Sequence, residues 1–143
     1  VTMMPVEAHM ISTAICYEVT YPALAREAVQ NGSEMLTTIT NDAWYGESRA
    51  AFQHFEMAAM RAIEQGRYHV RSANTGISGI IDPYGRVLVR TNLFETVAVV
   101  GEARFVQHKT LYARIGDLIA YVSMAIVLLA LGVAYKESRG RSH

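Results

Sequence analysis

The chain has 143 residues, of which 51% are hydrophobic, and its 13 basic and 13 acidic residues give a formal net charge of zero. A chain of this length and apolar content can bury one core of ordinary size. The balanced charge lacks the basic excess typical of nucleic-acid-binding proteins, so no nucleic-acid partner is expected. A single cysteine excludes an internal disulfide framework and a multi-cysteine zinc site.

The first predicted elements are a strand and a helix around the only cysteine. Residues 10–16 (MISTAIC) form a short apolar, β-branched run, which indicates a buried strand ending at Cys16. Pro22 is suited to a first helical turn, and the helix is expected to end at Asn31 and Gly32.

A second strand and a longer helix follow. Residues 35–40 (MLTTIT) predict a strand, and the Asn, Asp, Gly and Ser content of residues 41–48 predicts a loop. From Arg49 a helix is expected to run to about Gly66. Its predicted buried face comprises Phe52, Phe55, Ala59, Ala62 and Ile63.

Three further strands complete the predicted globular part. Two lie either side of the Pro- and Gly-containing turn at residues 82–85, within the stretch 76–91, and a third covers residues 96–105. The order of strands and helices favours an α/β layered domain.

The last long segment is uncharged and apolar. Residues 118–135 contain no charged side chain, and as a helix they would span about 27 Å, close to the roughly 30 Å of a bilayer core. Arg114 and Asp117 precede the segment and Lys136 follows it. A membrane-spanning helix over residues 114–136 is therefore predicted, with a short basic tail at 137–143. The alternative, a buried helix of a soluble protein, needs structure that covers all its faces.

Cys16 allows two readings. Free cysteines are among the most buried residues, so a structural role is the ordinary interpretation. A cysteine between a strand and a helix can instead be presented as a nucleophile, with the helix N-terminus favouring its thiolate form. In that reading the backbone N–H of Tyr17 helps to hold an oxyanion, and Glu18 adds a nearby carboxylate.

Other polar residues on the long helix are assigned structural roles. His54 and Glu56 have no second histidine at ligand spacing on this helix, so no metal site is predicted. Arg61, Glu64 and Arg67 are spaced to form ion pairs along one face.

Four stretches together carry a family resemblance: residues 15–22 (ICYEVTYP), 40–48 (TNDAWYGES), 61–87 (RAIEQGRYHVRSANTGISGIIDPYGRV) and 110–117 (TLYARIGD). In this order, and followed by a hydrophobic helix, they closely resemble the apolipoprotein N-acyltransferases. These bacterial membrane enzymes belong to the nitrilase (carbon–nitrogen hydrolase) superfamily. The resemblance implies a partial four-layer α-β-β-α sandwich: residues 1–113 correspond to the C-terminal part of a nitrilase-like catalytic domain, followed by one transmembrane helix.

The resemblance also implies catalytic roles. Cys16 matches the family nucleophile, and Glu18 matches a separate glutamate that follows it. The family's general-base glutamate and oxyanion-stabilising lysine lie on upstream segments, and neither Lys109 nor Lys136 matches that lysine. We therefore expect these 143 residues, which begin at Val1, to be a piece that needs the upstream half of the same protein and has no turnover alone.

By the same resemblance, the protein moves an acyl chain from a membrane phospholipid, through a thioester on Cys16, to the N-terminal amino group of diacylglyceryl-cysteine in apolipoproteins. No cofactor is implied. The expected location is the bacterial inner membrane, with the catalytic domain on the periplasmic side. Trp44 and Tyr45 are candidate substrate-binding residues in a loop that covers the site, although Trp44 could equally be a packing aromatic. The alternative functions are a membrane-anchored amidase that uses water as acceptor, and a non-catalytic anchored module.

Overall fold

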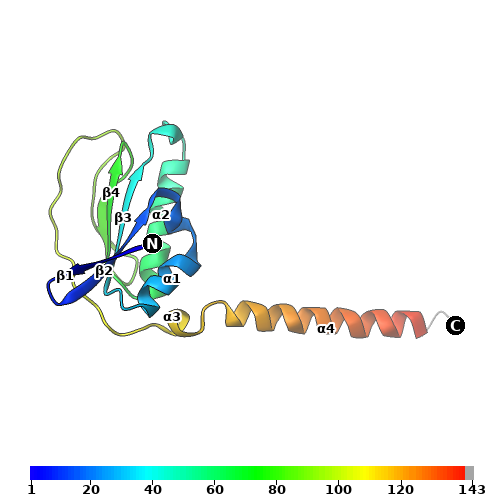
Figure 1. The fold of residues 1–143 in the computed structure, drawn as a ribbon. Helices are drawn as coiled ribbons and strands as arrows, with labels where there is room; N and C mark the ends of the chain where they lie inside the picture. Colours follow the sequence, from blue (N-terminus) through cyan, green and yellow to red (C-terminus); the bar gives the residue numbers. More distant parts are fainter. Residues whose placement is uncertain (141–143) are drawn as a thin grey trace.

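The fold is built on one six-stranded sheet with helices on one face (Figure 1). The computed structural model describes residues 1–140. In spatial order the strands are β1 (Thr2–Val6), β2 (His9–Ile15), β3 (Met35–Asn41), β4 (His69–Asn74), β5 (Gly79–Ile81) and β6 (Val87–Arg90). The central strands β2, β3 and β4 are parallel, and the outer pairings are antiparallel.

The helices are the 3₁₀ helix η1 (Cys16–Thr20), α1 (Pro22–Gln30), the 3₁₀ helix η2 (Ala43–Tyr45), α2 (Ala50–Gln65), α3 (Leu111–Ile115) and α4 (Leu118–Gly140). The three predicted helices are present in the expected order, together with three short helices, η1, η2 and α3, that were not predicted. α1 begins at the predicted proline, and α2 ends at Gly66, which adopts the left-handed conformation (φ 63°) typical of a helix C-cap. α1 connects the parallel strands β2 and β3, and α2 connects the parallel strands β3 and β4. Both helices therefore pack on the sheet that these strands form.

The core lies between the sheet and α2. Alternate residues of the central strands face the helices, because successive side chains of a strand point to opposite faces. The buried cluster contains Ala14, Val19, Phe55, Ala58, Ala59, Ala62, Ile77 and Ile81. The predicted buried face of α2 is confirmed for Phe55, Ala59 and Ala62. It is wrong for Phe52 and Ile63, which are 46% and 44% exposed; Ile63 lies at the edge of the contact, beside Gly85 in the turn between β5 and β6.

Two strands were not predicted, and one predicted strand is wrong. β1 and β4 lack a clear apolar alternation, since β4 carries His69 and Arg71 on its buried face. The segment at 96–105 forms no strand. Gly101 lies beside the Ile80 and Val89 side chains, so the segment crosses the face of the sheet, where its backbone is not aligned with a strand edge.

The structure contains two of the layers expected for a four-layer sandwich. α1 and α2 cover one face of the sheet, and the segment from residue 91 to 110 runs past the other (Figure 1). On that second face Ile15 and Ile39, which are paired in register, are 54% and 52% exposed.

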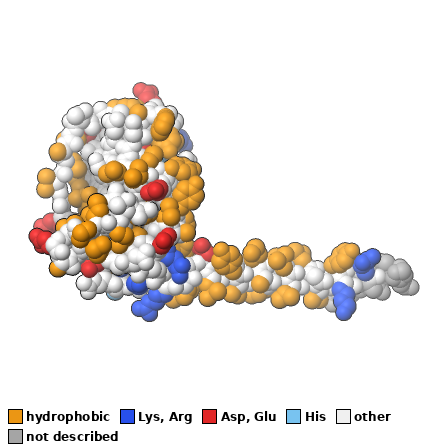
Figure 2. Space-filling model, in the orientation of Figure 1, with side chains coloured by type: hydrophobic (Ala, Val, Ile, Leu, Met, Phe, Trp, Pro, Cys, Tyr) orange, Lys and Arg blue, Asp and Glu red, His pale blue; other side chains and the backbone are white. Residues whose placement is uncertain are grey.

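α4 projects away from the sheet and the helices that cover it (Figure 1). Over Leu118–Lys136 it is long and apolar enough to cross a membrane, and none of that stretch is buried within the chain. Apolar side chains lie along the length of the face of α4 that Figure 2 shows. This full exposure argues against the alternative of a buried helix. α4 continues to Gly140, through the first part of the predicted basic tail, whereas residues 141–143 of that tail lie outside the described part of the chain.

Arg67 has the largest side chain among the fully buried residues, and its hydrogen bonds connect three segments of the chain near the end of α2. Its guanidinium donates to the carbonyl oxygens of Ser33 (2.9 Å), Gln65 (3.2 Å) and His108 (2.5 Å). The predicted ion pair is present between Arg61 and Glu64, at 2.7 Å. The prediction was wrong for Arg67, because α2 has ended before it and the side chain turns inward instead.

His69 is buried in β4 as a neutral ring. Its Nδ1 donates to the Ala58 carbonyl oxygen at 3.0 Å, so its Nε2 accepts from the Thr38 hydroxyl at 2.7 Å. Burial lowers the pKa of His69 to about 3.

Replacing the guanidinium of Arg67 tests its structural role. Arg67→Met leaves several buried carbonyl oxygens without donors, so the free energy of unfolding should fall by about 3 kcal/mol. Arg86→Met is the matched control: Arg86 pairs with Asp82, but its side chain is 72% exposed, so the loss should be about 1 kcal/mol or less. Thermal and denaturant unfolding of the detergent-solubilised protein measure both. Equal losses would contradict the assignment.

The buried His69 predicts a pH dependence of stability. The unfolded chain binds a proton near the ordinary pKa of 6.5, whereas the folded chain resists protonation until about pH 3. Stability from this group is therefore complete above pH 6.5 and falls as the pH drops from 6.5 towards 3. His69→Gln should be less stable at pH 7 but should lack this acid-dependent component. Denaturant unfolding between pH 4 and 7 checks the slope, and an unchanged slope in the variant would count against the assignment.

Candidate active site at the carboxyl ends of the parallel strands

The candidate site lies where β2, β3 and β4 end. Ile15 pairs in register with Ile39, and Asn41 pairs with Asn74, so the residues that follow the three parallel strands meet at one edge of the sheet. Cys16 directly follows β2, and Asp42 directly follows β3. Ligand sites of open α/β sheets are commonly built at this edge.

Cys16 occupies a sharp turn from strand to helix. Its φ is 52°, in the left-handed region that non-glycine residues rarely adopt. Glu18 stabilises the turn, since its Oε2 accepts from the Ile15 N–H at 2.8 Å. Cys16 is half-buried, so the reading of a cysteine sealed in the core is not supported. The helix that follows is the five-residue 3₁₀ helix η1, and α1 begins only at Pro22, so Cys16 does not directly precede the predicted α-helix.

A buried polar triad supports the Cys16 turn. Nε2 of His54, on α2, donates to the Cys16 carbonyl oxygen at 3.3 Å. Nδ1 of the same ring lies 3.0 Å from Asp42 Oδ1 and 3.0 Å from Arg71 Nη2. Nδ1 donates to the carboxylate when it carries a hydrogen and accepts from the guanidinium when it does not. The bond that connects α2 to the backbone of Cys16 requires a hydrogen on Nε2, so it is absent when the ring carries its only hydrogen on Nδ1.

Asp42 and Arg71 form the charged centre of this triad. Arg71 Nη2 donates to Asp42 Oδ2 at 2.8 Å, and both side chains are completely buried. Burial alone would raise the pKa of Asp42, but the hydrogen bond with His54 and the charge of Arg71 outweigh it and hold that pKa below its usual value. Burial lowers the pKa of Arg71, opposed by Asp42. A charge pair this deep is costly to break, because either partner alone would be an uncompensated buried ion.

The three predicted aromatic residues near Cys16 in the site differ in exposure, and two of them, Tyr17 and Tyr45, contact the His54 ring. Tyr45 is half-buried, and its ring meets the His54 ring edge-on at 5.8 Å. Burial, followed by the negative charges of Asp42 and the Cys16 thiolate, raises the pKa of Tyr45. Tyr17 is 57% exposed and Trp44 is 81% exposed. Trp44 therefore does not pack within the described residues, whereas Tyr45 does.

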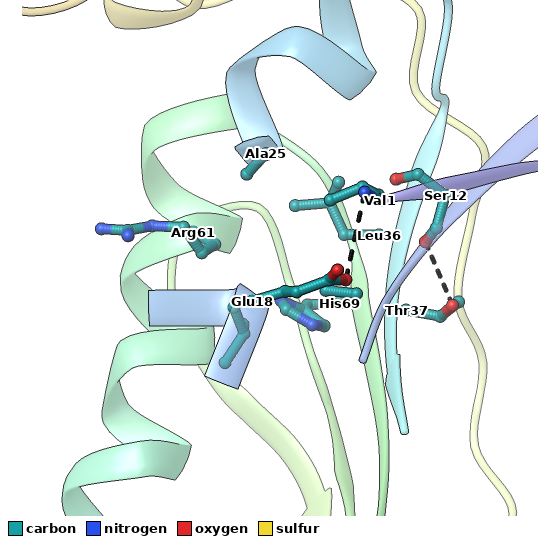
Figure 3. A pocket seen from close by; sticks show the side chains of 10 residues that line it. Val1, Ser12, Glu18, Ala25, Leu36, Thr37, Arg61 and His69 are labelled. Atoms are coloured by element: carbon teal, nitrogen blue, oxygen red, sulfur yellow. Dashed lines mark hydrogen bonds and ion pairs between the residues drawn. The ribbon is translucent and has the colours of Figure 1, made fainter. Parts of the chain in front are cut away.

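A small pocket next to η1 shares Glu18 with this site (Figure 3). Ser12, Leu36 and His69 line it from the sheet, and Ala25 and Arg61 line it from the helices. Cys16 is not among its lining residues. The pocket therefore belongs to the interior between sheet and helices.

Metal binding has no ligand set in this region. Among residues 1–140, no three His, Cys, Asp or Glu side chains are grouped closely enough to hold an ion. His54, the one histidine at the site, is occupied by Asp42, Arg71 and the Cys16 carbonyl.

Sequence reasoning found Cys16 but missed the residues that support it. Asp42 was assigned only to a loop, and Arg71 lay in an unpredicted strand. A usable signal was present: His69, Arg71 and Ala73 alternate on the side of β4 that faces the helices, so Arg71 had to find a buried partner.

These features define a class: an α/β protein with a cysteine on a strand–helix turn at the carboxyl edge of a parallel sheet. The chain belongs to the carbon–nitrogen hydrolase family, whose pattern matches residues 2–105. It is similar to two proteins named apolipoprotein N-acyltransferase. That of Geobacter metallireducens is 39% identical over 126 residues, covering 88% of this chain and 24% of the relative. That of Azotobacter vinelandii is 43% identical over 104 residues, covering 73% and 20%. The chain thus spans about a quarter of the length of these relatives.

Solved structures of the nitrilase superfamily share the fold. An amidase from Nesterenkonia AN1 matches with a TM-score of 0.54 and 19% identity, over 64% of this chain and 37% of the amidase. A branch 10 member from Saccharomyces cerevisiae matches with a TM-score of 0.55 and 18% identity, over 66% and 38%. Another structure of the amidase, with a TM-score of 0.51, 19% identity and coverage of 64% and 37%, carries the acetamide moiety of fluoroacetamide on its active-site cysteine. These likenesses confirm the predicted nitrilase-like α/β fold.

Gly76 tests how tightly the buried pair is held. A Cβ at this position would lie 2.3 Å from Asp42 Oδ2 and 2.8 Å from Asp42 Cβ, so Gly76→Ala must displace the carboxylate. We expect the free energy of unfolding to fall by about 3 kcal/mol. Gly132→Ala is the control, because a Cβ there meets nothing within 4 Å. Unfolding measurements that place both variants within about 0.5 kcal/mol of the unsubstituted protein would refute this account of Gly76.

Proposed function

We propose that this chain carries the nucleophile of a membrane acyltransferase that acylates the N-terminal amino group of diacylglyceryl-cysteine in apolipoproteins, with a membrane phospholipid as acyl donor. The observation that carries the proposal is the presentation of Cys16: it is half-buried, on a left-handed turn at the carboxyl edge of the parallel strands. The names of the similar relatives support the reaction class. The covalent adduct on the amidase cysteine supports a nucleophilic role for a cysteine in this fold.

The proposed reaction has two steps through one covalent intermediate. The Cys16 thiolate attacks the ester carbonyl of the phospholipid; the C–S bond forms, the ester C–O bond breaks, and the lysophospholipid leaves as an alcohol after taking a proton. The apolipoprotein amine then attacks the thioester; the C–N bond forms, the C–S bond breaks, and the amine proton passes to a base. Division into two transfers is the usual benefit of a cysteine nucleophile.

The surrounding residues receive roles in this scheme. The Tyr17 N–H is proposed to donate to the oxyanion, and Glu18 to maintain the turn through its bond to Ile15. Trp44 and Tyr45 are proposed to contact the acyl chains, Trp44 from the exposed tip of the loop and Tyr45 from beside His54. The general base and the oxyanion lysine of the family are proposed to come from sequence outside these 143 residues. The described chain alone is then expected to show no turnover.

The membrane setting follows from the substrates. Both are lipids, so the reaction needs a site held at a bilayer surface, and α4 is long and apolar enough to provide the anchor. We place the protein in the bacterial inner membrane with the catalytic part on the periplasmic side. Hydrolysis by an anchored amidase would use the same cysteine with water as acceptor, but the relatives' names favour transfer.

Substitution of the nucleophile tests the proposal. In the intact protein, Cys16→Ser should reduce acyl transfer at least about a hundredfold, because a hydroxyl is far less ionised than a thiol near neutral pH. The assay supplies labelled phospholipid and a diacylated lipopeptide in vesicles and measures the amide-linked product.

Two outcomes of this assay would contradict the proposal, one the role of Cys16 and the other the transfer reaction. Undiminished transfer by a correctly folded Cys16→Ser variant would remove Cys16 from its role. Release of free fatty acid without lipopeptide acylation by the unsubstituted protein would point to a hydrolase. An unchanged unfolding transition shows that the variant is folded.

A further inference from the structure

α2 has an unpartnered apolar flank. Three large side chains on the side away from the sheet, here called the outer α2 face, are exposed: Phe52 46%, Met57 40% and Met60 49%. Phe52, Met57 and Met60 line a groove together with polar side chains of the same helix. Arg49, Gln53 and Glu56 line the same groove, so this face is amphipathic, which is typical of a helix that lies at a membrane interface.

The start of the membrane helix is fixed to the same helical layer through α3. Arg26 of α1 donates from Nε to the Ala113 carbonyl oxygen at 3.1 Å and from Nη2 to that of Arg114 at 2.9 Å. The Thr110 hydroxyl, at the N-cap of α3, donates to the Glu64 carbonyl oxygen at 2.5 Å. α3 is thus bonded to both α1 and the last turn of α2.

The link from α3 to α4 is short and braced. Only Gly116 and Asp117 separate the two helices, which limits the distance between their ends to about 10 Å. The Tyr112 hydroxyl donates to Asp117 Oδ1 at 2.8 Å. Burial and this bond raise the pKa of Tyr112 to about 12, so the hydroxyl remains a donor at neutral pH. If α4 crosses a bilayer, the surface of that bilayer must therefore lie close to α1, α2 and α3.

The orientation of the elements places α2 towards that bilayer. α1 and α2 lie on the side of the sheet from which α4 leaves, and α2 runs crosswise to α4 (Figure 1). A membrane crossed by α4 along its length would run parallel to α2. Basic side chains lie where α4 meets the body, with acidic side chains beside them, and apolar side chains are present on the neighbouring surface (Figure 2). Cationic side chains at this level attract anionic lipid headgroups.

We propose that the outer α2 face lies in the headgroup and upper acyl region of the bilayer that α4 crosses. The apolar side chains insert below the headgroups, while Arg49 and Glu56 on the same side of α2 extend their charged ends to the aqueous side. The occupant is lipid rather than protein because the braced link holds this face near the membrane surface. The inference depends on α4 crossing the membrane and is independent of the acyl-transfer chemistry.

Lipid contact can be measured residue by residue. In a background with the native cysteines replaced, Met60→Cys and Val100→Cys carry the same environment-sensitive fluorophore. The intact protein is reconstituted in phosphatidylethanolamine–phosphatidylglycerol vesicles with and without a phospholipid spin-labelled near the headgroup. Val100 is the matched control: it is 93% exposed and lies in the segment on the opposite side of the sheet. We expect at least twofold stronger quenching at position 60 than at position 100.

The other outcomes overturn the proposal. Equal quenching at both positions means that the face is in water. Blue-shifted emission at position 60 without quenching by the labelled lipid means that protein covers it, either a second copy or another segment of the same protein. Met57→Cys repeats the measurement one turn away, so a local effect of one substitution does not decide the result. None of these readings depends on catalytic activity.

Discussion

The arrangement of the candidate site depends on one buried ion pair, between Asp42 and Arg71. Neither side chain is exposed, so each charge is tolerated only when the other is in place. Asp42 follows β3, Arg71 lies within β4, and Gly76 leaves the space that the carboxylate fills. The pair therefore fixes the ends of two strands and the turn after them. It also sets the environment of His54.

His54 carries this constraint to Cys16. The bond from its Nε2 to the Cys16 carbonyl oxygen connects the buried pair to a backbone turn with a φ of 52°. Such a conformation is unfavourable for a non-glycine residue, and it persists only when surrounding contacts determine it. Glu18 holds the turn from the other side. The position of the Cys16 sulfur therefore depends on the buried residues that hold the turn. The same residues, Asp42, His54 and Arg71, determine both the backbone conformation of Cys16 and the surroundings of its thiol.

The sequence predicted elements well where one local pattern decided them. The apolar run of β2, the proline that opens α1 and the glycine that ends α2 are short-range signals, and the structure confirms them. β4 was missed because its buried side chains are polar, and the strand at 96–105 was wrong because a β-forming composition does not place a segment at a sheet edge. The predicted buried face of α2 was partly wrong, because helical spacing shows which side of a helix is apolar but not how many of its side chains reach the sheet.

By itself the sequence determined the α/β order, the uncharged helix and the position of the only cysteine at the end of a strand, since each of these is written in neighbouring residues. The tertiary structure decided which polar groups meet. Asp42, His54 and Arg71 are 12 to 29 positions apart, and only parallel strands in register with a helix across them bring their atoms within about 3 Å. Burial then makes that meeting obligatory, because an unpaired charge in the core is strongly unfavourable.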